Sequence, residues 1–112
     1  MKLFSTRTHG VLDYLSVGAL IALPRVLGWK KDATSLLTGA ALGTLGYSLL
    51  TNYELGAIGA LSMKAHLALD AMSGAMLCAA PLLLSPQNKQ VNTTLVGLGL
   101  FELAAATLTE KQ

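Results

Sequence analysis

The chain has 112 residues, of which 53% are hydrophobic and 12% are charged, and its formal net charge is +2. Because soluble domains carry roughly 25% charged residues, this chain has few charges with which to cover a water-exposed surface. The small net charge, with no basic cluster larger than Lys30–Lys31, excludes nucleic acid as an expected partner. We therefore expect a single membrane domain over residues 1–112, with the lipid bilayer as its surroundings.

The N-terminal residues resemble the charged start of a signal peptide. The apolar stretch that follows contains His9 and Asp13 and has no clear small-residue cleavage site. We therefore expect this stretch to be retained as a membrane helix. The single cysteine, Cys78, excludes an intramolecular disulfide and is not a metal motif by itself.

The pattern basic–x–His–x–x–Leu–Asp occurs twice, beginning once at Arg7 and again at Lys64. Within each copy the His and the Asp are four residues apart, so they share one face of a helix. Each copy opens a long apolar run. The pattern predicts a tandem repeat, with repeat 1 at about residues 5–51 and repeat 2 at about residues 62–109.

Four apolar segments follow one another, at about residues 5–28, 33–51, 63–84 and 91–109. About 20 apolar residues in a helix cross a hydrocarbon core of about 30 Å, so we expect each segment to span the membrane. Short polar turns near Trp29 and Ser85 join the segments in pairs. The connection Asn52–Ser62 is too short to cross, and we expect it to lie in the interface with Tyr53 as an anchor.

These segments predict an all-α fold, a four-helix transmembrane bundle of two tandem two-helix repeats with pseudo-two-fold symmetry. Up-down connectivity puts both termini and the Asn52–Ser62 connection on one side of the membrane. Lys and Arg are equally divided between the sides, four on each, but Arg25 lies within a helix end. Because Arg25 therefore counts less, the side with the termini carries the larger share of positive charge, and the positive-inside rule places the termini in the cytoplasm.

Two series of small residues predict close helix packing. The second segment carries Gly39 and Gly43, and the third carries Ala71, Ala75 and Ala79. Small residues at a spacing of four allow membrane helices to approach closely. The alternative is that the glycines only reflect the general abundance of glycine in membrane helices.

Several motifs together carry a family resemblance: His9–Tyr14, Pro24–Trp29, Tyr47–Gly56, and Met63–Asp70 with Ser73–Gly74. They resemble the SPW-repeat family, small prokaryotic integral membrane proteins built from two copies of a two-helix unit. The resemblance covers nearly the whole chain and implies the membrane fold and a bacterial inner (cell) membrane, but no defined activity. Both Ser-Pro-Trp motifs are degenerate here, since only Pro24 and Pro81 remain.

The acidic and imidazole side chains inside the apolar segments are the candidate site residues. Asp13 lies about eight residues into the first segment, about 12 Å along its axis. A carboxylate at that depth is costly unless it is paired or faces water. Because the two copies match in depth, we expect their His–Asp pairs to face each other. The predicted polar cluster is His9, Asp13, His66, Asp70 and Glu102, with the basic residues Arg7 and Lys64 at its entrance.

Three roles stay open for this cluster. The first is structural, with hydrogen bonds that fix the register between the repeats. The second is a path for protons or small ions, because titratable groups inside a membrane are functional candidates and His titrates near neutrality. The third is a transition-metal site with two His and two carboxylate ligands. Glu102 has no counterpart in repeat 1, and we expect it to be protonated or hydrogen-bonded at a helix contact.

We expect a small integral membrane protein that is not an enzyme and that packs, or assembles with partners, through small-residue seams. Its expected partners are further copies of itself or other membrane proteins. The alternatives are a proton or small-ion conductor that uses the His–Asp pairs, and a metal-dependent membrane enzyme. We assign no catalytic residue, cofactor or metal ligand, because the sequence has no phosphate loop, zinc motif, nucleotide fingerprint or hydrolase elbow.

Overall fold

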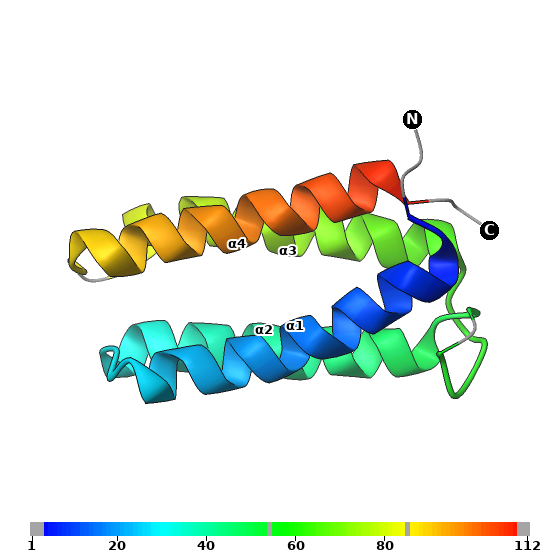
Figure 1. Ribbon diagram of the computed structural model, residues 1–112, viewed down its shortest axis with the longest axis horizontal. Helices are drawn as coiled ribbons and strands as arrows, with labels where there is room; N and C mark the ends of the chain where they lie inside the picture. Colours follow the sequence, from blue (N-terminus) through cyan, green and yellow to red (C-terminus); the bar gives the residue numbers. More distant parts are fainter. Residues whose placement is uncertain (1–3, 54, 85, 110–112) are drawn as a thin grey trace.

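The computed structural model describes residues 4–53, 55–84 and 86–109. It consists of four helices, and the described residues contain no β-strand, so the predicted all-α fold is confirmed. Ser85, which marks the second predicted turn, lies outside the described residues. The helices, labelled in Figure 1, are α1 (Thr6–Val26), α2 (Lys31–Leu50), α3 (Met63–Leu83) and α4 (Lys89–Leu108).

Three of the helices, α2, α3 and α4, are long and apolar enough to cross a membrane. The fourth, α1, has 21 residues and does not meet the same measure. It carries Arg7, His9, Asp13 and Arg25 along its length. The bundle therefore combines three strongly apolar helices with one that carries more charged residues along its length.

The helices begin and end where local sequence signals direct. Three of them start with a side-chain cap, from Ser5 for α1, Ser62 for α3 and Asn88 for α4. Each cap oxygen accepts a hydrogen bond from the backbone N–H three residues later, at 3.1, 3.1 and 2.9 Å respectively. At the end of α1, Gly28 has a positive φ of 66°, and Trp29 N–H reaches back to the Pro24 carbonyl at 2.9 Å. This is a Schellman motif, in which glycine fits the left-handed position.

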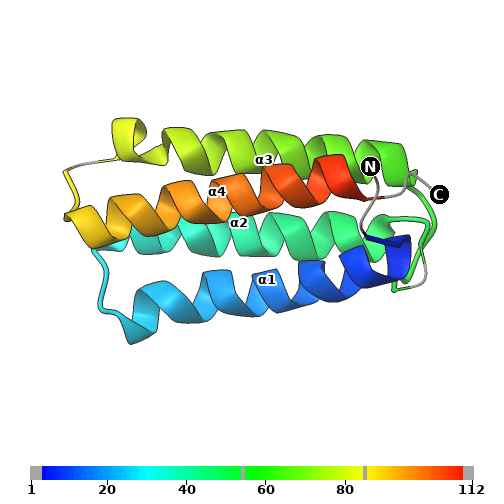
Figure 2. The ribbon, with the colours of Figure 1, turned by 45° about the horizontal axis from the view of Figure 1, so that its top comes forward.

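The molecule is built from two helical hairpins. Hairpin 1 consists of α1 and α2, hairpin 2 consists of α3 and α4, and most contacts between helices lie within a hairpin. Figure 1 shows the hairpins as two layers, with the first turns of α1 lying towards hairpin 2. Figure 2 shows the four helices running along one common direction. The start of α1 and the end of α4 meet at Phe4 and Thr109, at the same end of the bundle as the connection between α2 and α3.

The interior is divided along the bundle into an apolar half and a polar half. The apolar half lies towards the turn at Trp29 and contains, from α1 to α4, Val17, Leu20, Ala33, Leu37, Ala41, Leu77, Ala80, Val91 and Leu95. The polar half lies towards the Asn52–Ser62 connection and contains buried His, Asp and Thr side chains. Large apolar side chains such as Leu15, Met72 and Leu82 are instead exposed, at 66%, 68% and 89%. An apolar exterior, with the buried polar side chains confined to one half of the interior, suits solvation by lipid.

Close helix packing occurs between α3 and α4, but Gly39 and Gly43 of α2 take no part in it. A side chain at Gly39 or Gly43 would meet nothing within 4 Å, so these glycines form no seam within the described part of the chain. The close approach is made by Gly74 and Gly99, whose backbones leave no room for a Cβ on either residue. The close contact at Gly74 and Gly99 was not predicted, and packing through the alanine series of α3 stays a prediction.

The two hairpins correspond closely in their boundaries. The offset between α1 and α3 is the same at their starts, Thr6 and Met63, as at their ends, Val26 and Leu83. The offset between α2 and α4 is also constant, but it is longer by a single residue. The extra residue therefore lies in the connection between α3 and α4, outside the helices. The pseudo-two-fold relation between the hairpins is consistent with these boundaries and stays a prediction.

Replacing Gly99 by alanine should lower the stability of the bundle. The new methyl group would clash with the Gly74 carbonyl oxygen and with Cys78, and overpacking of this kind costs about 1–3 kcal/mol. Thermal unfolding of the purified protein in detergent, followed by circular dichroism, measures the loss. Gly97→Ala is the matched control, because position 97 on the same helix is open. Equal stability of the two variants would contradict the close crossing.

Candidate functional site

The repeated sequence pattern places its polar residues at one depth in two helices. In α1 and α3 the cap serine is followed by a histidine four residues later and an aspartate after one further turn. All four side chains are buried: His9 and His66 are 1% and 0% exposed, and Asp13 and Asp70 are 6% and 4% exposed. We call these four residues the His–Asp cluster.

Each histidine of the cluster lies closer to the aspartate of the other hairpin than to its own. His9 Nε2 is 2.6 Å from Asp70 Oδ2 and 3.2 Å from Asp13 Oδ1. His66 Nε2 is 2.8 Å from Asp13 Oδ2 and 3.2 Å from Asp70 Oδ2. The expected convergence of the two pairs is therefore present, and the shortest contacts run across the interface between the hairpins.

The other ring nitrogen of each histidine is held by a threonine, again from the opposite hairpin. His9 Nδ1 lies 2.7 Å from Thr109 Oγ1, and His66 Nδ1 lies 2.7 Å from Thr51 Oγ1. Each threonine hydroxyl donates its one proton to a helix carbonyl, of Ala105 at 2.5 Å or of Tyr47 at 2.6 Å. The hydroxyl oxygen must then accept from Nδ1–H. Both imidazoles are thereby fixed with Nδ1 protonated and Nε2 directed at the carboxylates.

Two tyrosines hold the carboxylates. The Tyr47 hydroxyl donates to Asp70 Oδ1, and the Tyr53 hydroxyl donates to Asp13 Oδ2 at 2.8 Å. Burial, followed by the nearby Asp13 charge, raises the pKa of Tyr53, which keeps this hydroxyl protonated as a donor. Tyr53, expected as an interface anchor, therefore has its hydroxyl directed into the bundle. The Tyr14 hydroxyl donates to the Leu55 carbonyl at 2.8 Å and holds the same connection against α1.

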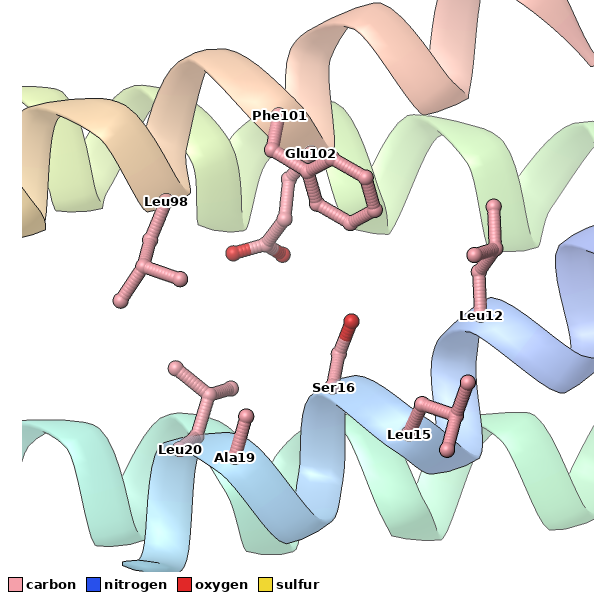
Figure 3. Close-up of a pocket in the computed structure, with 8 residues that line it drawn as sticks. All are labelled: Leu12, Leu15, Ser16, Ala19, Leu20, Leu98, Phe101 and Glu102. Carbon is pink, nitrogen blue, oxygen red and sulfur yellow. The ribbon is translucent and has the colours of Figure 1, made fainter. Parts of the chain in front are cut away.

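Two neighbouring cavities lie near the cluster, a small one that borders it and a larger one between α1 and α4. A small one of about 10 Å³ borders His9, Asp13 and Asp70. A larger one of about 200 Å³ is lined mainly by apolar side chains. Figure 3 shows the larger cavity, with Ser16 and Glu102 directed towards each other across it. Leu12, Ser16, Phe101 and Glu102 line both cavities.

The remaining predicted site residues lie outside the direct contacts of the cluster. Glu102 borders the small cavity, and its Oε2 atom is buried with no hydrogen-bond partner among the described residues. Arg7 and Lys64 are exposed near the starts of α1 and α3, and their role at an entrance stays a prediction.

Sequence reasoning did not assign four residues that contact the cluster: Tyr47, Thr51, Tyr53 and Thr109. The threonines were visible as two matching Leu-Thr pairs, one at the end of each repeat. Because the offset between these pairs is longer by a single residue than the offset between the histidines, the threonines and the histidines do not align as parts of one motif. The tyrosines have no such signal, because Tyr47 lies in the second apolar segment and Tyr53 in the connection after it, and no tyrosine follows Tyr53 in the chain.

Thr51→Val should destabilise the protein while preserving the shape of the side chain. It would leave Nδ1–H of His66 buried without an acceptor, at a cost of about 1–3 kcal/mol. Thermal unfolding in detergent measures the loss. Thr94→Val is the matched control, because the Thr94 hydroxyl also donates to a helix carbonyl, at 2.8 Å from Gln90 O, but belongs to a surface position. If both variants unfold at the same temperature, Thr51 does not hold the imidazole.

Comparison of the chain with protein-family models, with curated proteins and with solved structures gave no match. The resemblance to the SPW-repeat family therefore stays a prediction from the sequence motifs. The role of the His–Asp cluster must be argued from its geometry.

Proposed function

We propose that the protein is a non-enzymatic integral membrane protein in which the His–Asp cluster joins two helical hairpins into one unit. One observation carries the proposal: the contacts at 2.6 and 2.8 Å both link a histidine of one hairpin to an aspartate of the other. The threonine contacts at 2.7 Å also link a histidine of one hairpin to a residue of the other. Most other contacts between helices lie within a hairpin.

The membrane environment makes such a joint effective. Between helices in lipid there is no hydrophobic driving force, so packing and polar contacts determine association. A buried group that loses its partner in this environment is costly, which disfavours any other register of the hairpins. The apolar outer surface, with residues such as Leu42 and Leu100 exposed, supports lipid as the main surrounding partner. It also leaves room for contact with further copies of the chain or with other membrane proteins.

We further propose a bacterial cell membrane as the location, with the start of α1 and the end of α4 facing the cytoplasm. The resemblance to the SPW-repeat family supports the location. The distribution of Lys and Arg, with Arg25 inside a helix end, supports the orientation. The polar half of the bundle would then lie nearer the cytoplasmic side.

Asp70→Leu should strongly destabilise the protein if the His–Asp cluster joins the hairpins. It would leave His9 Nε2 without its shortest contact and Tyr47 without its acceptor, and breaking a buried pair costs about 3–5 kcal/mol. Asp70→Asn keeps hydrogen-bonding capacity and should lose much less. The control is Glu102→Leu, which removes an acid outside the cluster. Thermal unfolding in detergent compares the three, and equal stability of Asp70→Leu and the wild-type protein would overturn the proposal.

The cavities favour a second candidate function, the conduction of protons. The larger cavity and the small one share Ser16 and Glu102, so polar groups run from the space between α1 and α4 to the cluster. Titratable residues placed in this way inside a membrane are candidates for proton relays.

Vesicles that contain the reconstituted protein test conduction directly. Under an imposed potential, a pH-sensitive dye should report a proton flux, and Glu102→Gln should abolish this flux while leaving the unfolding temperature nearly unchanged. The double variant Asp13→Asn with Asp70→Asn should also stop it. A wild-type flux no greater than that of protein-free vesicles would exclude this function.

A further inference from the structure

We propose that the His–Asp cluster binds one divalent first-row transition-metal ion, with His9, His66, Asp13 and Asp70 as its ligands. The proposal builds on the joint described above, because the same side chains are involved, but it rests on separate observations. Each residue offers one ligand atom, and these four atoms lie within 4.8 Å of one another. In a tetrahedral site with bonds of about 2.0 Å, neighbouring ligand atoms lie about 3.3 Å apart. The contact of each histidine with the aspartate of its own helix, 3.2 Å, is close to that value. The contacts across the hairpins, 2.6 and 2.8 Å, are shorter, so these two pairs of atoms must move apart when an ion enters.

The tautomer of the two imidazoles is the one that metal binding requires. Since Thr109 and Thr51 accept from Nδ1–H, the lone pair of each neutral imidazole is on Nε2 and points into the cluster. Metal-bound histidines usually donate their other N–H to a second group, which fixes the tautomer and the ring orientation. Both threonines have this role, and the two contacts have equal lengths of 2.7 Å.

His66 supplies an observation that hydrogen bonding alone does not explain. Its Nε2 atom is fully buried, yet no described residue offers it a hydrogen-bond partner in a suitable direction, although Asp13 Oδ2 lies only 2.8 Å away. An oxygen close to a ring nitrogen but off the axis of its lone pair is expected when a cation lies on that axis and contacts both atoms. The lone pair of His66 is therefore available for a metal ion.

Charge also favours a divalent ion. Two aspartates carry two negative charges, and two neutral imidazoles carry none, so one divalent cation makes the buried site neutral. A buried site must be close to neutral, because an uncompensated charge inside a membrane is costly. The tyrosine hydroxyls on Asp13 and Asp70 complete an outer layer of hydrogen bonds around the ligating carboxylates.

The ligands select the class of metal. Imidazole and carboxylate suit Zn²⁺, Fe²⁺, Co²⁺ or Mn²⁺, whereas Cu⁺ favours thiolate and thioether ligands. The chain's one cysteine, Cys78, has its Sγ near the Val96 carbonyl and takes no part in the cluster. The adjoining cavity of about 10 Å³ is of the order needed for a single water molecule. A water molecule there could serve as a fifth ligand.

Metal titration of the untagged, full-length protein in detergent tests the proposal. After treatment with a chelator, the protein should bind one Co²⁺ per chain, with the visible absorption bands of a low-symmetry site, and Zn²⁺ should displace the Co²⁺. His66→Gln and Asp70→Asn should each weaken binding at least tenfold. Asp32→Asn, an acid on α2 at the opposite end of the bundle, is the control and should bind as the wild-type protein does.

A milder variant covers the case in which the ligand variants do not fold. Thr51→Val leaves all four ligands in place and should still weaken Co²⁺ binding about 10–100-fold, as expected for loss of a group that orients a ligand. Circular dichroism confirms that the variant is helical before each titration. Unchanged binding in this folded variant would contradict the argument from the tautomer.

The outcomes separate this proposal from the structural one. If the folded wild-type protein binds no Co²⁺ or Zn²⁺ in a saturable, one-to-one manner, the metal site is excluded. In that case the Nε2 atoms of His9 and His66 each carry a proton. If binding is saturable but unaffected by His66→Gln and Asp70→Asn, the ion lies elsewhere and the proposal is wrong. In either case Asp70→Leu, compared without metal, still decides whether the cluster joins the hairpins.

Discussion

The structure depends on the internal solvation of four polar side chains in the polar half of the bundle. Two carboxylates and two imidazoles cannot be left unpaired among apolar helices. The hydrocarbon core of the membrane offers them no hydrogen bonds, so each lost contact destabilises the protein. Every ring nitrogen of His9 and His66 accordingly lies within 2.8 Å of a polar atom. The helix starts, the helix ends and the connection after α2 are all arranged so that these atoms meet.

This requirement explains why the interior changes character along its length. Near the turn at Trp29 the helices meet through Leu, Val and Ala side chains, which pack without regard to hydrogen bonding. At the other end, residues of the connection between α2 and α3 contact α1. The Tyr53 hydroxyl donates to Asp13, and the Leu55 carbonyl accepts from the Tyr14 hydroxyl. Gly10 permits this, because a Cβ there would meet the side chains of Leu55 and Tyr53. Tyr53 and Leu55 of the connection therefore take part in the hydrogen bonding of the polar half.

Sequence periodicity could predict the helices and the shared face of His and Asp, because both depend on spacing within one helix. It could not predict the tyrosine and threonine partners, which reach the cluster from other helices or from a folded connection. The prediction of a seam at Gly39 and Gly43 was wrong for a related reason: spacing shows that these glycines share a face, but not that this face points outwards. Gly99, which has no glycine partner four residues away, makes the close contact.

The contacts of each histidine with the opposite hairpin explain why the His–Asp pattern is needed in both hairpins. His9 takes both its shortest carboxylate contact and its threonine from hairpin 2, and His66 takes both from hairpin 1. A single hairpin would keep only the contact at 3.2 Å within its own helix. Neither hairpin can therefore satisfy its own histidine, whereas two similar hairpins satisfy each other. Both copies of the pattern are thus needed to bury the cluster with the contacts that the structure has.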